Sequence, residues 1–293
     1  RLLQDEEELS KDINHLLGKI CADQETLAKH PNALGVVAVW QWEASQNNAN
    51  LNEILNLAIA RLAEDDDRAD GLGFLALGLA MNNLDRWADK VVRKVLEDIQ
   101  NEKDPNVLAR VIGTLSQAAV HLRSISTLNK LKKAALLIED EWMQAEALFW
   151  ISAGMALLKS EQKARELFAQ AFKLGVWDEF NMPALDQLWT APSSINQYLS
   201  ENDYIGWHST KVAAIFAWLA IAVVRPPGWI LHSGVHLINT ISEGYSEKRS
   251  ECLGLLVSIL NGKEDMRQDF TDLYLNALSS AKNRQIGEVW AVL

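Results

Sequence analysis

One acidic run has the residue types and spacing that could support chemistry. Asp66, Asp67 and Asp70 form the pattern Asp-Asp-X-X-Asp. Carboxylates one helical turn apart can hold Mg²⁺ against a diphosphate when they face a deep cavity. A second acidic motif should then lie far downstream, but the best candidate stretch has Thr240 where an acid belongs. We therefore interpret the run as a solvated acidic start of an apolar helix.

A second group consists of His232 and His236, with Glu243 two helical turns further on. The four-residue spacing places both imidazoles on one helix face, but a metal site also needs a third ligand and buried groups that hydrogen-bond to the ligands. No Glu adjoins either histidine, and the sequence contains no P-loop, nucleophile elbow or dinucleotide fingerprint. We expect no catalytic residue, no bound metal and no cofactor.

The elements that would carry such residues are helices that recur at a nearly constant spacing. Six apolar segments begin 36 or 38 residues apart, except for a step of 66 residues between the fourth and the fifth. They begin near Ala33, Gly71, Val107, Ala145, Lys211 and Arg249. A fixed period of roughly 20–50 residues indicates stacked supersecondary units. The sequence predicts an all-α, right-handed α-solenoid over residues 1–293, a single domain with an irregular repeat at 177–210.

Each apolar segment is followed by a second helix with one apolar stripe, so the repeating unit is a helical hairpin. We name its first helix A and its second helix B. Trp87, Val91, Val95 and Ile99 form one such stripe at helical spacing. A helices that are apolar on most sides must be covered on all sides. We expect six or seven antiparallel hairpins with a period of 36–38 residues and with the A helices inside.

Two segments resemble known families of helical repeats. Residues 145–174 resemble a tetratricopeptide repeat, with Ala164, Phe168 and Ala171 at that family's small, aromatic and small positions. The opening Asp104-Pro105, an N-cap followed by proline, resembles the start of a HEAT repeat. Residues 136–148 are similar to the repeat arms behind signalling NTPase modules. These resemblances imply an α-solenoid that serves as a binding module of a larger assembly.

The charge of the chain indicates its possible partners, and its cysteine content and apolar runs indicate its cellular setting. The 293 residues carry a net charge of −11, which disfavours nucleic acid and favours basic peptides or basic protein faces. Lys130, Lys132 and Lys133 form the densest basic patch. Only two cysteines are present, too few for a disulfide framework, so we expect a reducing, cytoplasmic setting. The longest apolar run, 212–224, has 13 residues and is too short to span a membrane.

The chain is rich in tryptophan, with eleven residues. Those within the apolar A helices, such as Trp150 and Trp218, are expected to fill the core. Other aromatic residues gather in the irregular stretch, outside the periodic pattern, and are candidate partner-binding anchors. These candidates are Trp177, Trp189, Tyr198, Tyr204 and Trp207.

The sequence therefore predicts a non-catalytic scaffold that binds a protein or peptide. The alternative is an enzyme in which the hairpins close into an (α/α) toroid that acts on a sugar or a polyprenyl-type substrate. Self-association is a third option, because the final residues 289–293 are apolar, whereas terminal repeats normally carry a polar outer face.

Overall fold

A computed structural model gives the fold of the chain. It describes residues 56, 59–60, 68–174, 208–224, 238, 241, 248–249 and 252–256. These residues form helices, turns and short connectors, with no strand among them, so the described part of the chain is all-α as predicted. They belong to two compact units, Arg1–Glu102 and Lys103–Leu293. Each unit is treated by itself.

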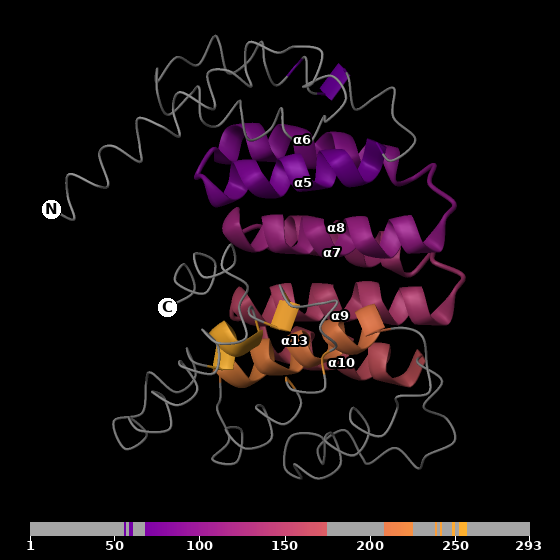
Figure 1. Cartoon of the computed structure of the whole chain (residues 1–293), viewed down its shortest axis with the longest axis vertical. Helices are drawn as coiled ribbons and strands as arrows, with labels where there is room; N and C mark the ends of the chain where they lie inside the picture. The colour runs from indigo at the N-terminus through magenta and orange to yellow at the C-terminus, as the bar shows by residue number, and fades with distance from the viewer. Residues whose placement is uncertain are drawn as a thin grey trace, which may run out of the picture. The chain divides into compact units, whose positions relative to one another are not determined.

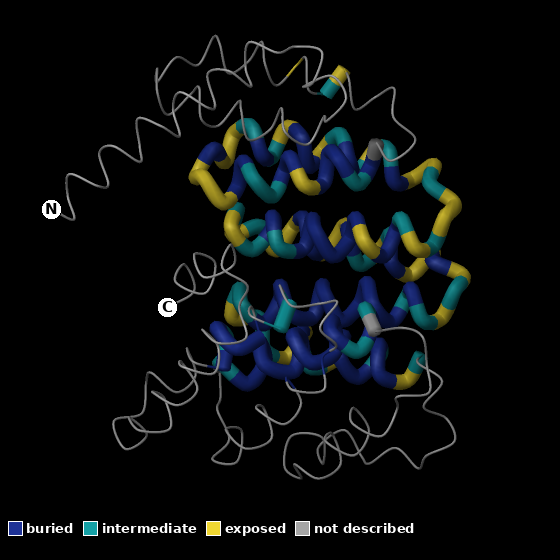
Figure 2. The backbone as a smooth tube through the Cα atoms, viewed as in Figure 1, coloured by how far each residue is buried: buried dark blue, intermediate teal, exposed yellow. Residues whose placement is uncertain are grey.

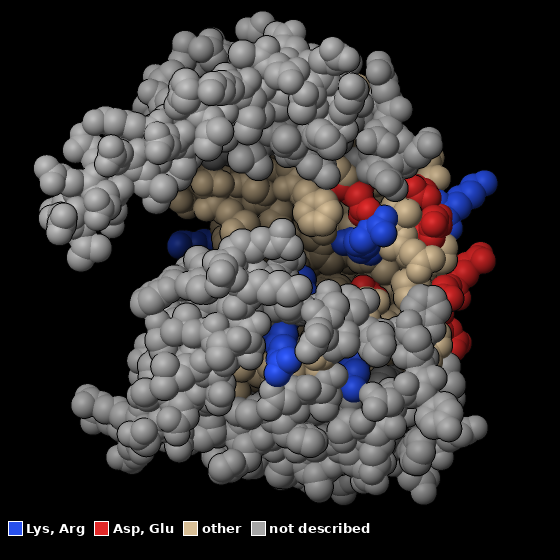
Figure 3. Space-filling model, viewed as in Figure 1, with Lys and Arg blue, Asp and Glu red and all other residues tan. Residues whose placement is uncertain are grey.

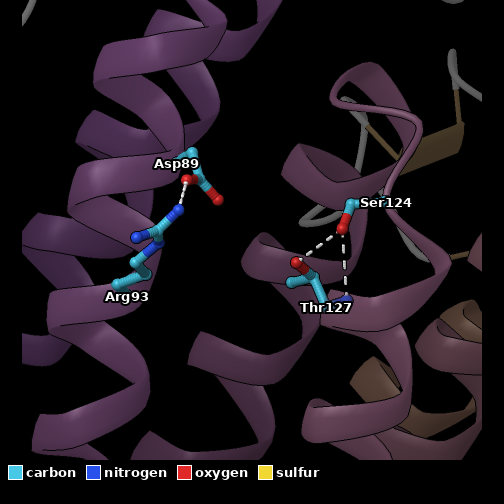
Figure 4. Close-up of polar contacts among 4 residues, drawn as sticks. All are labelled: Asp89, Arg93, Ser124 and Thr127. Atoms are coloured by element: carbon cyan, nitrogen blue, oxygen red, sulfur yellow. Dashed lines mark hydrogen bonds and ion pairs between the residues drawn. The ribbon is translucent and has the colours of Figure 1, made fainter.

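The first unit contains an antiparallel hairpin of α5 (Arg68–Met81) and α6 (Asp85–Asp98) (Figure 1). The helix α5 is almost wholly apolar. The helix α6 instead buries one stripe formed by Ala88, Val91, Val92 and Val95. Its opposite face is charged, and Arg93 forms an ion pair there with Asp89, one turn earlier (Figure 4). The two helices thus have the predicted A and B characters.

The second unit continues with two further hairpins and one more long helix (Figure 1). Their helices are α7 (Pro105–His121), α8 (Ile125–Ala135), α9 (Glu141–Leu157), α10 (Glu161–Leu174) and α13 (His208–Val224). The A helices α5, α7 and α9 begin 37 and 36 residues apart, which agrees with the spacing predicted from the sequence.

Side-chain caps fix where three of these helices begin. The Asp104 carboxylate accepts a hydrogen bond of 2.8 Å from the Asn106 amide, with Pro105 at the first helical position, as the sequence predicts. The Asp140 carboxylate accepts one of 2.9 Å from the Met143 amide at the start of α9. Ser124 accepts a hydrogen bond from the Thr127 amide at the start of α8, and the two hydroxyls lie 2.9 Å apart (Figure 4). Each cap satisfies a backbone donor that the helix itself leaves free.

The same three-residue connector joins A to B in all three described hairpins. Its middle residue, Asn83, Arg123 or Lys159, has a left-handed backbone with φ of 57°, 50° or 63°. The amide of the third residue bonds back to the carbonyl five residues earlier, for example Ser160 to Met155 at 2.8 Å. This is the Schellman arrangement that ends a helix. Its repetition makes the three hairpins equivalent in local geometry.

The core of the second unit is built around α9, which contacts α7, α8, α10 and α13. Thirteen of its 17 residues are buried, so α9 is covered on all sides as predicted for an A helix (Figure 2). Phe149 meets Phe168 of α10 edge to face, with ring centroids 5.1 Å apart. The Ser152 hydroxyl donates a 2.7 Å hydrogen bond to the Ala164 carbonyl. Aromatic packing and a buried hydrogen bond therefore join the two helices of this hairpin.

The helix α13 packs directly on α9, although 67 residues separate their first residues. It is buried along nearly its whole length, and Trp218 is among the most completely buried side chains described. In the described part of this unit, α13 thus takes the place of the A helix next to α9. Of the predicted irregular repeat at 177–210, only residues 208–210 lie within the described residues.

Candidate functional site

The most unusual chemistry in the described residues is a buried carboxylate between α9 and α13. Glu146 lies in the first half of α9 and is 7% exposed. Its Oε2 atom accepts hydrogen bonds of 2.7 Å from the Ser209 hydroxyl and 3.3 Å from the Thr210 hydroxyl. Both donors stand in the first turn of α13. A single acidic side chain of α9 therefore accepts hydrogen bonds from α13, a helix more than 60 residues away in the sequence.

The indole of Trp150 completes this cluster one turn further along α9. Its side chain helps to stabilise the charged form of Glu146, and its ring packs against Phe216 of α13 with centroids 5.2 Å apart. The Lys248 ammonium lies over the indole, 5.3 Å from the ring centroid. On the α7 side the ring covers Gly113, where an added Cβ would lie 2.9 Å from Trp150 Cδ1. Trp150 is thus enclosed, as expected of a core tryptophan.

Burial governs the electrostatics of Glu146. Desolvation raises the pKa of this carboxyl above its ordinary value, while the bonds from Ser209, Thr210 and Trp150 and the charge of Arg110 oppose that rise. Since two hydroxyl donors of α13 engage the carboxylate, it is suited to holding α13 against α9. It would also respond to pH, because its charged form is disfavoured by burial.

Glu146 has one recognisable signal in the sequence, although it belongs to no catalytic or metal-binding motif. Glu146 is the only charged residue between Glu141 and Lys159, in the middle of an otherwise apolar helix. An acid at such a position must find buried donors or a changed pKa. The donors themselves could not be predicted, because they come from residues more than 60 positions away.

The aromatic residues predicted to bind a partner lie outside the described residues. These are Trp177, Trp189, Tyr198, Tyr204 and Trp207. Their assignment as a partner-binding site therefore stays a prediction. The described chain resumes at His208, and the two residues that follow His208 are the donors to Glu146.

The residues considered above for metal or diphosphate chemistry are also mostly outside the described part. His232, His236 and Glu243 are not described, and of the acidic run only Asp70 is, in the first turn of α5. Among the described residues, no group of three His, Cys, Asp or Glu side chains is placed to hold a metal ion. Cys252 is buried, at 0% exposed.

Charge and apolar exposure define the surface of the described helices. Residues 68–174 contain 15 Lys and Arg against 13 Asp and Glu, so the acidic excess of the chain comes from other residues. Both signs of charge are visible on the face drawn in Figure 3. Phe74 and Met81 of α5 are 50% and 56% exposed, and Leu136 and Leu137 after α8 are 43% and 80% exposed. No helix in the described ranges is both long and apolar enough to cross a membrane.

The described part of the chain is all-α and consists of packed helical hairpins and the further helix α13. No protein-family model, curated protein or solved structure matches the chain. The resemblance to tetratricopeptide and HEAT repeats therefore depends on the residues and the hairpin geometry alone.

Proposed function

We propose that this chain is a non-catalytic helical-repeat scaffold that binds a protein or peptide partner, as a module of a larger assembly. Its architecture would be a right-handed α-solenoid of six or seven hairpins, similar to tetratricopeptide and HEAT arrays. In such arrays each unit contacts only its neighbours and the stack presents an extended surface.

One observation carries this proposal. In the second unit, α9 packs between the A helices α7 and α13 while its own B helix, α10, also contacts it. Three described hairpins also share the same left-handed connector, at Asn83, Arg123 and Lys159. Equivalent units whose A helices contact the next A helix are typical of a solenoid.

The predicted aromatic residues supply a candidate anchor for the partner. Trp177, Trp189, Tyr198, Tyr204 and Trp207 precede α13 in the chain. Trp and Tyr are enriched among the residues that dominate binding energy at protein interfaces. The net charge of −11 favours a basic partner, and the whole of that negative excess lies outside residues 68–174.

The alternative is a toroid enzyme acting on a sugar or a polyprenyl-type substrate. The observation in its favour is that α9 and α13 are buried along nearly their whole length, since inner helices of a closed toroid need such apolar surfaces. Turnover of a sugar or polyprenyl-type substrate by the chain purified to homogeneity would support the toroid enzyme over the scaffold.

Affinity capture with a matched variant tests the scaffold function. The full chain, immobilised, should retain a protein partner in a stoichiometric amount from a lysate of its source. Replacing Trp189, Tyr204 and Trp207 together by Ala should abolish retention while far-UV circular dichroism stays unchanged. Replacing the exposed Phe74 by Ala is the control and should leave retention intact. Failure to retain any stoichiometric partner, or equal retention by both variants, would contradict the proposal.

A further inference from the structure

The B helix α8 differs from the other described B helices in its charge. It carries Lys130, Lys132 and Lys133 and no acidic residue, and residues 111–138 as a whole contain no Asp or Glu. By contrast, α6 pairs Lys94 with Asp98 at 3.4 Å, and α10 pairs Arg165 with Glu161 at 2.8 Å. The described residues hold no such ion pair for a lysine of α8. Its positive charge is therefore left for something outside these helices.

Two exposed leucines lie next to these lysines at the end of α8. Leu136 is the C-cap of α8 and is 43% exposed, and the next residue, Leu137, is 80% exposed. Lys130 and Lys133, three residues apart, share one face of α8, and both are exposed. Leu137 lies just beyond the C-cap of the same helix. We call the set Lys130, Lys133, Leu136 and Leu137 the α8 surface.

The backbone holds the α8 surface in a fixed conformation. The Leu136 amide bonds to the Lys132 carbonyl at 3.1 Å, and the Leu137 amide bonds to the Ala134 carbonyl at 3.0 Å. The other side of the helix is anchored by Leu128 and Leu131, both fully buried. A partner that docks here would not have to order these leucines' backbone, which lowers the entropic cost of binding.

We propose that the α8 surface binds an acidic, amphipathic helical segment of a partner protein. Glu or Asp side chains of that segment would meet Lys130 and Lys133, and its apolar side chains would cover Leu136 and Leu137. An amphipathic helix presents its anchors at helical spacing, so one such segment can place acidic and apolar side chains on the two parts of this surface. The inference deepens the scaffold function proposed above and rests on it.

The neighbouring connector argues for a short acidic segment over a continuous polyanion. Glu139, Asp140 and Glu141 follow Leu137 directly, and Glu139 and Glu141 are exposed. A nucleic acid backbone or an anionic membrane that crossed the lysines would also meet these carboxylates and be repelled. A peptide can end its acidic stretch before it reaches them.

Binding of defined probes by the full chain tests this inference. The probe is a fluorescent 18-residue amphipathic peptide with Glu and Leu at helical spacing, compared with the same peptide carrying Lys in place of Glu. We expect the Glu/Leu peptide to bind about tenfold more tightly than the Lys/Leu peptide, with the difference shrinking at high salt. An equally charged oligonucleotide and phosphatidylserine vesicles should bind more weakly than the Glu/Leu peptide.

Matched variants locate the binding on the α8 surface. Lys130→Glu with Lys133→Glu should weaken binding of the Glu/Leu peptide about tenfold, and Leu137→Ser should weaken it several-fold. Lys163→Glu with Lys173→Glu makes the same charge change at exposed positions of α10 and should stay within about twofold of wild type. Equal losses in both double variants, or tighter binding of the oligonucleotide or vesicles, would overturn the inference.

The affinity capture described above separates this inference from the scaffold function. If the Lys130→Glu, Lys133→Glu chain retains the stoichiometric partner as well as wild type does, the α8 inference is overturned while the scaffold stands. If its retention falls and that of the Lys163→Glu, Lys173→Glu chain does not, the inference is supported. If wild type itself retains no partner, the scaffold function fails.

Discussion

Replacing Gly113 by alanine tests how α7 packs on α9. An added Cβ would lie 2.9 Å from Trp150 Cδ1 and 3.1 Å from Trp150 Nε1, whereas non-bonded carbon atoms prefer separations of about 3.5–4.0 Å. The indole has little freedom to withdraw. It packs against Phe216 with ring centroids 5.2 Å apart, and it is only 7% exposed. The new methyl group must therefore push the two helices apart.

The size of the effect follows from two opposing contributions. Exchanging Gly for Ala in a helix interior stabilises by about 1 kcal/mol. Inserting a methyl group into a filled core destabilises by about 1–3 kcal/mol. At Gly113 the second contribution should dominate, so we expect the free energy of unfolding to fall by about 1 kcal/mol.

Two other helical glycines provide the matched comparison. At Gly78 of α5 an added Cβ meets no atom within 4 Å, so Gly78→Ala should stabilise by about 1 kcal/mol. At Gly154 of α9 the Cβ would lie 2.9 Å from the Cδ2 atom of Leu128, a methyl group that can rotate partly away. Gly154→Ala should therefore fall between the other two variants.

The assay is urea unfolding of the full chain followed by far-UV circular dichroism, with the three Gly→Ala variants and wild type measured side by side. A second background separates the clash from other causes. In a Trp150→Leu chain the indole is gone, so adding Gly113→Ala should become neutral or stabilising, and the double-mutant cycle should show coupling of about 1–2 kcal/mol. If Gly113→Ala stabilised wild type as much as Gly78→Ala does, the packing of α7 on α9 would be refuted.

The remaining predictions concern the buried acid, a connector and a cap. Because burial raises the pKa of Glu146 above 4.5, the folded state binds its proton more tightly than the unfolded state does. The Glu146 contribution to stability is therefore lost as pH rises from about 4.5 through the folded-state pKa. Glu146→Gln should abolish this loss, as measured by unfolding curves at several pH values. If the variant kept the pH dependence of wild type, the raised pKa of Glu146 would be disproved. Lys159→Gly removes a left-handed non-glycine residue and should raise the free energy of unfolding by about 0.5–1 kcal/mol. The control Lys163→Gly, inside α10, should lower the free energy of unfolding. Thermal melts in which Lys163→Gly had the higher melting temperature of the two would contradict this prediction. Asp140→Ala removes the cap on the Met143 amide and should cost about 1 kcal/mol in urea unfolding, while Asp140→Asn should cost much less; equal costs for the two would argue against a capping role.

The helices could be predicted because each depends on local sequence. The apolar segments starting near Gly71, Val107, Ala145 and Lys211 correspond to α5, α7, α9 and α13, and the cap at Asp104-Pro105 is where the sequence places it. Such signals depend on helical periodicity and on single capping residues, which act over a few positions.

The site was harder to predict because its contacts span long stretches of chain. Glu146 obtains its donors from Ser209 and Thr210, and Trp150 meets Phe216 and Lys248. No local pattern reports such pairings. The left-handed connectors were missed for a different reason: Arg123 and Lys159 stand where glycine or asparagine is the usual signal.

Small-angle X-ray scattering, with the mass determined on the same sample, tests most directly whether the hairpins form an extended scaffold. A compact globule of this length should have a radius of gyration of roughly 19 Å. We predict a monomer whose radius of gyration lies clearly above that value, with an asymmetric distance distribution. A monomer at the compact value would contradict the open array and favour the closed toroid.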